Sequence, residues 1–541
     1  MFIRRSVSSA AAAAAAASPF LSGARVAGMR VLGSTSVGAL SSAAAARSLA
    51  TKAEVAAMSP EEWSKEWAHA VSGIRADLDF EESSQQLREL IQTGLLRFTD
   101  IRDNPERFFE AHRLLAYHAT NLGPGFWIRF TVQYNLFAGS VMGLASDEQR
   151  ELLEDMQDRG ELGCFALTEK FAGVNSGMVV NTQAEWDEEQ GDFVLSTPDE
   201  GAEKNWISQG YTADKALVLA SLTVKGKPLG PHAFVMNFRE NGELVPGVEL
   251  TDMGRKTIGN DLDNASIRFD GARVPREALL SRFCEVSEEG EYKQTVKGVK
   301  PFAMIGQRLF TGRVAVAQAA TSFRKRLFER TKEYSDGKNI WAPPSANGTM
   351  PEVALSSIPQ LKSLYEEEQG KAQVMDAFLD QCEAELSECL QRDEIPPEAL
   401  IEAIAVAKVR AVEESIDLSF RLKQEVGSYA LMDGSGFEQS DFLQCCKFAE
   451  GDSRILMLKM ARDKMKAYQR DPTAAATSKR EAELCAKLTE EIGKEVAETG
   501  DQAAAWDNNF ESVYELARGV MERTFEDTMR RAEERETEAS A

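Results

Sequence analysis

The sequence predicts a mainly helical α+β protein in which a β segment separates two helical segments. Three observations lead to this fold class. Before about residue 163, apolar residues recur every three or four positions, which is typical of amphipathic helices. Between about 164 and 285 they alternate with polar residues, as in half-buried strands. From about 300 the helical spacing returns, and the long amphipathic runs there indicate a helix bundle.

Composition limits the classes of function. With 541 residues, of which 43% are hydrophobic and 27% are charged, the chain can bury a large core and divide into several domains. Its formal net charge of -24 and its pI of about 4.9 exclude the basic footprint that nucleic-acid binding needs. The seven cysteines have no CxxC spacing and there are four histidines, so neither a disulfide framework nor a metal site is indicated. We therefore expect any acid–base chemistry to rest on carboxylates.

Residues 1–53 have the composition of an organelle transit peptide. They lack Asp and Glu, and their positive charges stand among Ala, Ser and Gly, at Arg4, Arg5, Arg25, Arg30, Arg47 and Lys52. A disordered low-complexity tail would have a similar composition. We expect a location in the mitochondrial matrix, with a plastid or a peroxisome as alternatives, although the C-terminal "TEASA" is not an SKL-type signal. We find no apolar run long enough to cross a bilayer.

Local patterns predict the elements of the first two segments. Residues 54–163 are expected to form a helical domain, because "SPEEWSKEW" begins with a helix-start signal and "DEQRELLEDMQ" has helical spacing. Residues 164–285 are expected to form a compact β domain. Its strands are predicted in "DFVLSTP", "KALVLASLTV", "PHAFVMNF" and "ASIRFDGARVP", with turn signals such as "VKGKPLG" between them.

The remaining residues are predicted to be helical. Residues 300–470 are expected to form a bundle with helices in "TGRVAVAQAATSFRKRLFERTKEY", "SLYEEEQGKAQVMDAFLDQCEAELSECL" and "EALIEAIAVAKVRAVEESIDLSFRLKQEV". The stretch "WAPPSANGTMPE" is expected to be a loop. Residues 471–541 are rich in Ala and Glu and are expected to form a pair of acidic accessory helices.

Several motifs follow one another at the junctions of these segments. They are "GCFALTEKFAG" at 163–173, "KNWISQG" at 204–210 and "GRKTIGNDLDNASIRFDGARVPREALLSRF" at 254–283. Together they resemble the acyl-CoA dehydrogenase and oxidase superfamily, over about residues 100–465. "VQYNLFAGSVMGL" and "HAFVMNFRENGELVPGVEL" are more similar to the oxidases. The resemblance implies an N-terminal helical domain, a middle β-barrel domain, a C-terminal helix bundle and extra C-terminal helices.

The resemblance also implies a reaction and its base. Proteins of this family form a trans double bond between the α and β carbons of an acyl-CoA, while FAD accepts a hydride. Because a thioester α proton is a weak acid, a positioned carboxylate must remove it. Glu450 in "KFAEG" matches the family's base, and Arg313 and Gly451 match positions that contact the substrate. The structural alternatives are a capping carboxylate for Glu450 and a helix-surface charge for Arg313.

Further residues match the family's FAD contacts. Thr168 matches a contact to the pyrimidine edge of the flavin, and Trp206 and Ser208 match residues against its ring. Gly173, Ser176 and Lys338 match positions near the rest of the cofactor, and Lys338 replaces an arginine that reaches the FAD of a neighbouring subunit. As ordinary alternatives, Trp206 is a core aromatic and Thr168 a strand residue.

The sequence departs from the family pattern at two turns. The loop "TEKFAGVNSGM" is one residue longer, so that Asn175 or Ser176 can occupy the position of the usual pyrophosphate-binding hydroxyl residue. "MDGSGF" resembles a Gly-Gly-x-Gly-aromatic turn but has Asp433 at the first glycine, and Ala430 stands where dehydrogenases often have glutamine. An acid near a pyrophosphate is unfavourable unless it points away.

Two classes of function are therefore compared. The first is an FAD-dependent acyl-CoA oxidase that forms a trans-2-enoyl-CoA, the first step of fatty acid β-oxidation, with O2 as acceptor; an acyl-CoA dehydrogenase would instead pass its electrons to an electron-transferring flavoprotein. The second is a catalytically silent family member that acts as a structural or assembly subunit. The family also implies a homodimer or a dimer of dimers.

Overall fold

The computed structural model describes residues 52–76, 78–173, 179–295, 308–475 and 478–540. All but the last two residues of the predicted transit peptide, 1–53, lie outside these ranges. Within them, no helix has both the length and the apolar character that a membrane crossing requires. The described chain forms one compact unit, so its division at 163, 285 and 470 stays a prediction.

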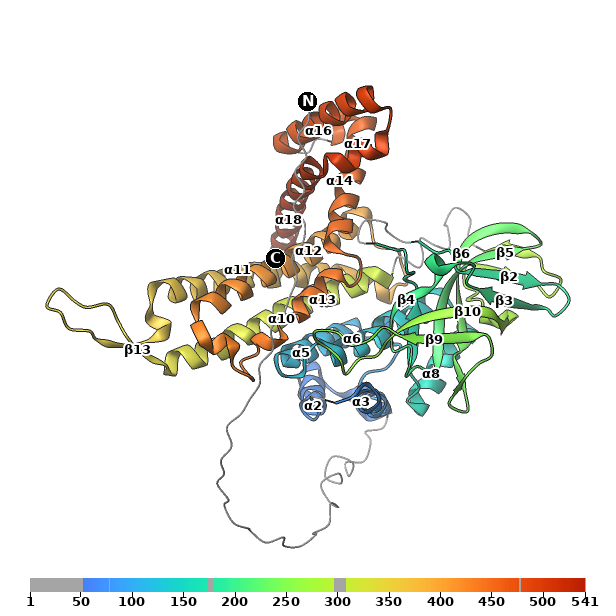
Figure 1. The fold of residues 1–541 in the computed structure, drawn as a ribbon, viewed down its shortest axis with the longest axis horizontal. Coiled ribbons are helices and arrows are strands. Elements are labelled where there is room, and N and C mark those ends of the chain that lie inside the picture. Colours follow the sequence, from blue (N-terminus) through green and yellow to red (C-terminus); the bar gives the residue numbers. More distant parts are fainter. Residues whose placement is uncertain (1–51, 77, 174–178, 296–307, 476–477, 541) are drawn as a thin grey trace, which may run out of the picture. The chain divides into compact units, whose positions relative to one another are not determined.

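The first part of the chain is helical, as predicted (Figure 1). Its helices are α1 (Lys52–Ala57), α2 (Pro60–Ser72), α3 (Phe80–Gln92), α4 (Asp100–Asp103), α5 (Pro105–Leu122), α6 (Pro124–Thr131), α7 (Gly139–Leu144) and α8 (Asp147–Arg159). The predicted start of α2 is confirmed by a capping box, in which Ser59 accepts from the backbone of Glu62 and Glu62 accepts from the backbone of Ser59.

A π-helix, η1 (Val132–Ala138), joins α6 to α7 and was not predicted. A π turn places an extra residue in the helix and so rotates the following side chains. Gln133 and Asn135 lie on it and are fully buried. Gln133 Oε1 accepts from the backbone N–H of Gly163 at 2.7 Å, so η1 holds the start of the first strand.

The middle of the chain forms a sheet whose described strands pair in the order β1-β5-β2-β3-β10-β4, with β6 beside β5 and β9 beside β10. These strands are β1 (Gly163–Ala166), β2 (Gln183–Asp187), β3 (Asp192–Ser196), β4 (Lys204–Ser208), β5 (Lys215–Val224), β6 (Lys227–Asn237), β9 (Val248–Asp252) and β10 (Asn264–Pro275). The four predicted strands are confirmed as β3, β5, β6 and β10. An isolated bridge between Glu169, just after β1, and Lys204 in β4 brings the two ends of this order together, as the expected barrel requires.

Two short strand pairs add to the β segment, and the second of them extends beyond its predicted limit. They are β7 (Arg239–Glu240) with β8 (Glu243–Leu244), and β11 (Cys284–Val286) with β12 (Tyr292–Gln294). The strands thus continue to Gln294 rather than ending at 285. The pair β11–β12 escaped prediction because "CEV" and "YKQ" are too short to show alternation.

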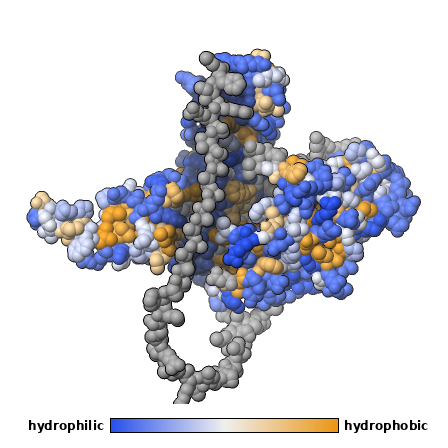
Figure 2. All heavy atoms as spheres, in the orientation of Figure 1, coloured by the Kyte–Doolittle hydropathy of each residue, from blue (hydrophilic) through white to orange (hydrophobic). Residues whose placement is uncertain are grey.

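The predicted bundle consists of α10 (Arg308–Gly337), α11 (Pro359–Gln391), α12 (Glu398–Glu425), α13 (Phe442–Phe448) and α14 (Ser453–Arg470). Figure 1 shows α10, α11 and α12 side by side, and α10 packs on both α5 and α12. The expected loop "WAPPSANGTMPE" is in fact framed by a hairpin, β13 (Asn339–Trp341) with β14 (Glu352–Ala354). Figure 2 shows apolar surface where α10 and α11 meet this hairpin.

The C-terminal region contains more than the expected helix pair. Two long helices, α16 (Lys479–Thr499) and α18 (Phe510–Ser540), pack together, and the short α17 (Gln502–Asn508) lies between them in sequence; α15 (Pro472–Ala475) precedes them. A buried carboxylate, Glu481, pairs with Lys464 of α14 and lies 2.7 Å from Arg523 Nε. Arg523 also contacts Glu402 of α12 at 2.6 Å, so this region is attached to the bundle through ion pairs.

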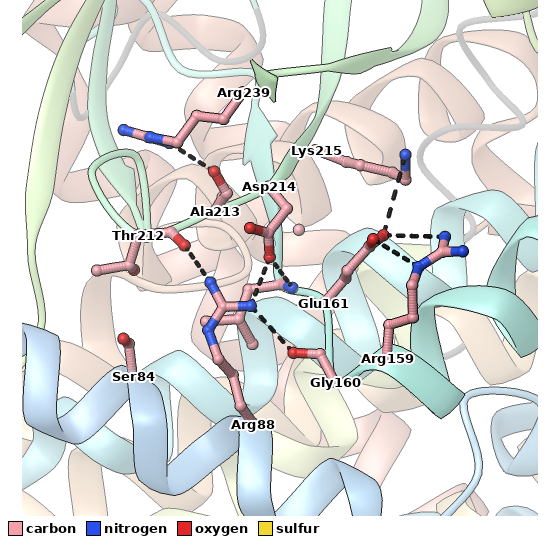
Figure 3. Close-up of polar contacts among 12 residues, drawn as sticks. Ser84, Arg88, Arg159, Gly160, Glu161, Thr212, Ala213, Asp214, Lys215 and Arg239 are labelled. Atoms are coloured by element: carbon pink, nitrogen blue, oxygen red, sulfur yellow. Dashed lines mark hydrogen bonds and ion pairs between the residues drawn. The ribbon is translucent and has the colours of Figure 1, made fainter. Parts of the chain in front are cut away.

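Polar contacts also join the first helices to the sheet (Figure 3). Arg88 of α3 lies 2.5 Å from Asp214 and donates to the backbone oxygens of Gly160 and Thr212 at 3.0 and 2.8 Å. Asp214 in turn accepts from the backbone N–H of Leu162 at 2.8 Å. One arginine thus fixes the chain just before β1 and just before β5.

Candidate active site

Glu450 lies in the short segment between α13 and α14, with a positive φ of 56°. Its side chain is buried, and Oε1 accepts a hydrogen bond from Asn135 Nδ2 at 3.1 Å. Its other oxygen, Oε2, is buried without a hydrogen-bond partner in the described structure. A non-glycine residue in this region of φ is uncommon and is often found at functional sites.

The capping alternative for Glu450 is wrong. The cap of α14 is Asp452, whose carboxylate accepts from the backbone N–H of Arg454 at 2.7 Å. Glu450 instead directs its carboxylate toward η1. The adjoining Gly451 has a φ of 95°, so the chain turns sharply between the carboxylate and the helix.

Burial raises the pKa of Glu450 to about 7, against the opposing effects of Arg313, Asn135 and Lys408. A carboxylate with a pKa near neutrality is a much stronger base than an ordinary glutamate and is still largely ionised at slightly alkaline pH. A raised pKa and an unpartnered oxygen are both found in carboxylates that act as general bases.

Arg313 lies beside Glu450, as its sequence position predicts. It is buried within α10, so the surface-charge alternative is wrong, and its Nε donates to the backbone oxygen of Glu450 at 3.1 Å. Burial lowers the pKa of Arg313 to about 10, at which the guanidinium is still protonated near pH 7. The preceding Gly312 packs directly against the Glu450 carboxylate, because a Cβ atom built on Gly312 would lie 2.3 Å from Cδ of Glu450.

Lys408 of α12 also holds this segment and was missed in the sequence. Its buried ammonium donates to the backbone oxygens of Lys447 and Gly451 at 2.6 and 2.9 Å and to Ser453 Oγ at 3.3 Å. Burial lowers its pKa to about 8. The available signal was a single lysine in the apolar run "AIAVAKVRAV". Asn135 was missed as well, although it interrupts an apolar stretch that the family resemblance includes.

Thr168, Trp206 and Ser208 lie at one edge of the sheet. Thr168 is exposed beyond the end of β1, and its backbone oxygen accepts from Asn205 N–H at 2.8 Å. Trp206 is 57% exposed at a φ of 58°, so it is not a core aromatic. Ser208 Oγ accepts from Asn264 at 3.1 Å. The structure therefore brings Thr168 and Trp206 onto neighbouring segments and exposes both.

A buried ion pair supports this edge. Lys204 Nζ lies 3.0 Å from Glu169 Oε1, and both side chains are inaccessible to solvent. Glu169 also accepts from the backbone N–H groups of Asn181 and Thr182, and Lys204 donates to the backbone oxygen of Leu167. Burial lowers the pKa of Lys204 to about 8. The residues on both sides of Thr168 and Trp206 are thereby fixed.

The remaining predicted FAD contacts are not gathered beside Thr168 and Trp206 in the described structure. Gly173 is described, whereas Asn175 and Ser176 lie outside the described residues. Lys338 is exposed just after the end of α10, 25 residues from Arg313. A helix rises about 1.5 Å per residue, which separates the two by about 37 Å. Within one chain, Lys338 therefore lies too far from Arg313 to contact the residues around Glu450.

The "MDGSGF" turn already holds a carboxylate of its own chain. Glu438 accepts from the backbone N–H groups of Gly434 and Gly436, at 3.1 and 2.9 Å, and from Ser435 Oγ at 3.2 Å. Asp433 is exposed and is not part of these contacts. Successive N–H groups of this kind attract anions, and here Glu438 occupies them.

Comparisons with known proteins show which proteins this chain resembles. Peroxisomal acyl-coenzyme A oxidase 2 of Arabidopsis thaliana is 32% identical over 275 residues, which are 49% of this chain and 38% of that protein. Among solved structures, acyl-CoA oxidase-2 of Caenorhabditis elegans, bound with FAD, ascaroside-CoA and ATP, has a TM-score of 0.69 at 21% identity and covers 87% of this chain and 76% of that one. Glutaryl-CoA dehydrogenase of Mycobacterium smegmatis has a TM-score of 0.56 at 18% identity, over 76% of this chain and 96% of that one. No family model matches the sequence.

The chain thus has the fold of the acyl-CoA oxidases and dehydrogenases, and the predicted fold class is confirmed. The resemblance to this superfamily is confirmed as well, since the curated relatives are named acyl-CoA oxidases. The chain spans about half the length of the curated relatives it matches. The roles assigned to individual residues stay predictions.

Proposed function

We propose that this protein is an FAD-dependent enzyme of the acyl-CoA oxidase type that converts an acyl-CoA into a trans-2-enoyl-CoA. The observation that carries the proposal is the buried carboxylate of Glu450, whose pKa is raised to about 7 and whose Oε2 has no partner in the described structure. The names of the curated relatives support the same reaction. A related structure is described as bound to FAD, which supports this cofactor.

The residues at the edge of the sheet fit a flavin. An exposed tryptophan on a short strand offers a flat apolar face, against which a planar ring can stack. Thr168 and Ser208 add hydroxyl groups on the same edge, and Gly173 begins the loop that would contact the pyrophosphate, with Ser176 as a further candidate outside the described residues. FAD, when bound, supplies the acceptor for the hydride that leaves the β carbon.

The protein's own residues carry the proton transfer. Glu450 accepts the α proton, so its ionised form is required before the reaction. The backbone N–H of Glu450 would hold the thioester oxygen as negative charge develops there. Arg313 fixes the backbone carbonyl of Glu450, and Gly451 allows the turn that follows it.

The structural-subunit alternative is supported by one observation, the occupation of the "MDGSGF" turn by Glu438. A carboxylate there would compete with a phosphate for the same N–H groups.

An absorption spectrum separates the two functions. Protein purified with added FAD is expected to be yellow, with a flavin band that bleaches when a saturated acyl-CoA is added without oxygen. A protein that stays colourless at high FAD concentration would support the structural role. Bleaching that is reversed by O2 identifies an oxidase, and bleaching reversed only by an electron-transferring flavoprotein identifies a dehydrogenase.

An organelle that oxidises fatty acids is the proposed location. The Arabidopsis relative is named peroxisomal, which supports the peroxisome among the expected alternatives. The composition of residues 1–53 supports an imported protein, and the mitochondrial matrix has no further support.

We expect a homodimer or a dimer of dimers. The separation of about 37 Å between Lys338 and Arg313 along α10 supports a contact of Lys338 with the FAD of another chain. Apolar side chains are also exposed at the same end of the bundle, where Tyr334 of α10 stacks on Tyr429 at 3.7 Å. These side chains are Trp341, Phe420, Leu431 and Met432. Light scattering should give the mass of two or four chains, and a monomer that retains its flavin would contradict this prediction.

A further inference from the structure

Among the residues that the structure describes, the side chain within hydrogen-bond distance of the Glu450 carboxylate is that of Asn135, 315 residues earlier in the chain. Asn135 is fully buried on η1, between the helical layer and α10. The packing around the pair is tight, because a Cβ atom at Gly312 would lie 2.6 Å from Asn135 Nδ2. Gly312 of α10 therefore packs against both side chains.

Asn135 and Glu450 each have one oxygen without a partner. Asn135 Oδ1 and Glu450 Oε2 are both buried and accept no hydrogen bond from the described residues. A buried acceptor without a donor is unfavourable. The α proton that Glu450 receives in the proposed reaction would supply a donor at this place.

We propose that Asn135 is a positioning residue for Glu450 in both of its proton states. Its amide donates to the ionised carboxylate before the reaction. After the α proton has moved to Glu450, rotation of the amide lets Oδ1 accept from the new carboxylic acid. This inference rests on the proposed function, with FAD as the hydride acceptor.

An amide suits this role because it carries both a donor and an acceptor on one planar group. The other charged groups that face Glu450 are cations, Arg313 of α10 and Lys408 of α12, and both favour the carboxylate only. Asp452, in the same segment, is engaged with the start of α14. Among the described residues, only Asn135 contacts the carboxylate and can respond to its protonation.

The test is the pH dependence of anaerobic flavin bleaching by a saturated acyl-CoA. For the wild type, the rate should rise as the pH passes through about 7, because Glu450 must be ionised. Asn135→Leu keeps the number and branching of the side-chain heavy atoms but removes the donor, so the midpoint should move up by about one pH unit and the rate below it should fall about 10-fold. Asn135→Asp keeps the shape and, once ionised, places a like charge beside Glu450, so its midpoint should move up further.

Ser140→Ala is the matched control. Ser140 is also fully buried, on α7 just after η1, and its Oγ has no partner in the described structure. Its profile should equal that of the wild type. If Asn135→Leu does not fold, the smaller Asn135→Ala, which also removes the donor, decides, since a purely structural role would lower the stability of that variant and leave its midpoint unchanged.

Two failures are distinguishable. A wild-type protein whose flavin never bleaches contradicts the proposed function. A wild-type protein that bleaches, together with Asn135→Leu and Asn135→Asp profiles that superimpose on it, overturns the role of Asn135 and leaves the function intact.

Discussion

Replacing Glu450 by Gln is expected to slow flavin reduction by acyl-CoA by about 10²–10⁴-fold, the usual effect of losing a general base. Gln has the shape of Glu but cannot accept the α proton. The amide can still accept from Asn135 Nδ2, so the packing around it should persist. FAD and acyl-CoA should therefore bind as before, and the loss should appear in the rate of bleaching at saturating substrate.

The measurement is anaerobic stopped-flow absorbance at equal flavin content. Asp452→Asn is the matched control, because it changes a neighbouring carboxylate that caps α14. Because Asn caps helices about as well as Asp, both the stability and the bleaching rate should change little. Equal rates for wild type and Glu450→Gln would move the search for the base to another carboxylate.

Gly312→Ala is expected to give the second large effect. The added methyl group would lie 2.3 Å from Cδ of Glu450, so the carboxylate must be displaced. A displacement of about 1 Å at a reacting group costs about 10²-fold in rate. Overpacking should also lower the free energy of unfolding by about 1–3 kcal/mol.

Gly370→Ala is the control for this substitution. Gly370 also lies inside a long bundle helix, α11, but nothing lies within 4 Å of an added Cβ atom. Alanine should stabilise the helix there by about 0.5–1 kcal/mol without affecting the rate. Thermal unfolding and bleaching rates of the two variants would be compared. A Gly312→Ala protein with wild-type kinetics would show that the carboxylate has room to move, contrary to the packing described.

The parts of the fold that could be predicted are those in which apolar residues recur at a regular spacing. The helices α10 to α12 and the strands β3, β5, β6 and β10 were predicted because each buries one face over many residues, and a buried face leaves a period in the sequence. The π-helix η1 left no such trace. Its extra residue is stabilised by contacts of Gln133 and Asn135 with segments distant in sequence, which a local pattern cannot contain.

The candidate site also contains residues that the sequence indicated and residues that it did not. Glu450 and Arg313 were found through a resemblance, and their proximity could not have been deduced from a separation of 137 residues. Lys408 and Asn135 look like ordinary helix residues until the fold buries them beside Glu450. The competing carboxylate of Glu438 was also invisible, because its partners are backbone N–H groups.

The three contacts of Lys408 have a consequence for the cost of the reaction itself. In water, dipoles must turn toward a charge as it forms, and this reorientation is a large part of the barrier. The segment that carries Glu450 is already fastened to α12 through the backbone oxygens of Lys447 and Gly451. Its peptide dipoles are therefore oriented before any substrate binds. In the proposed reaction, the reorganisation energy would be met when the chain folds, and it would not be met again in each turnover.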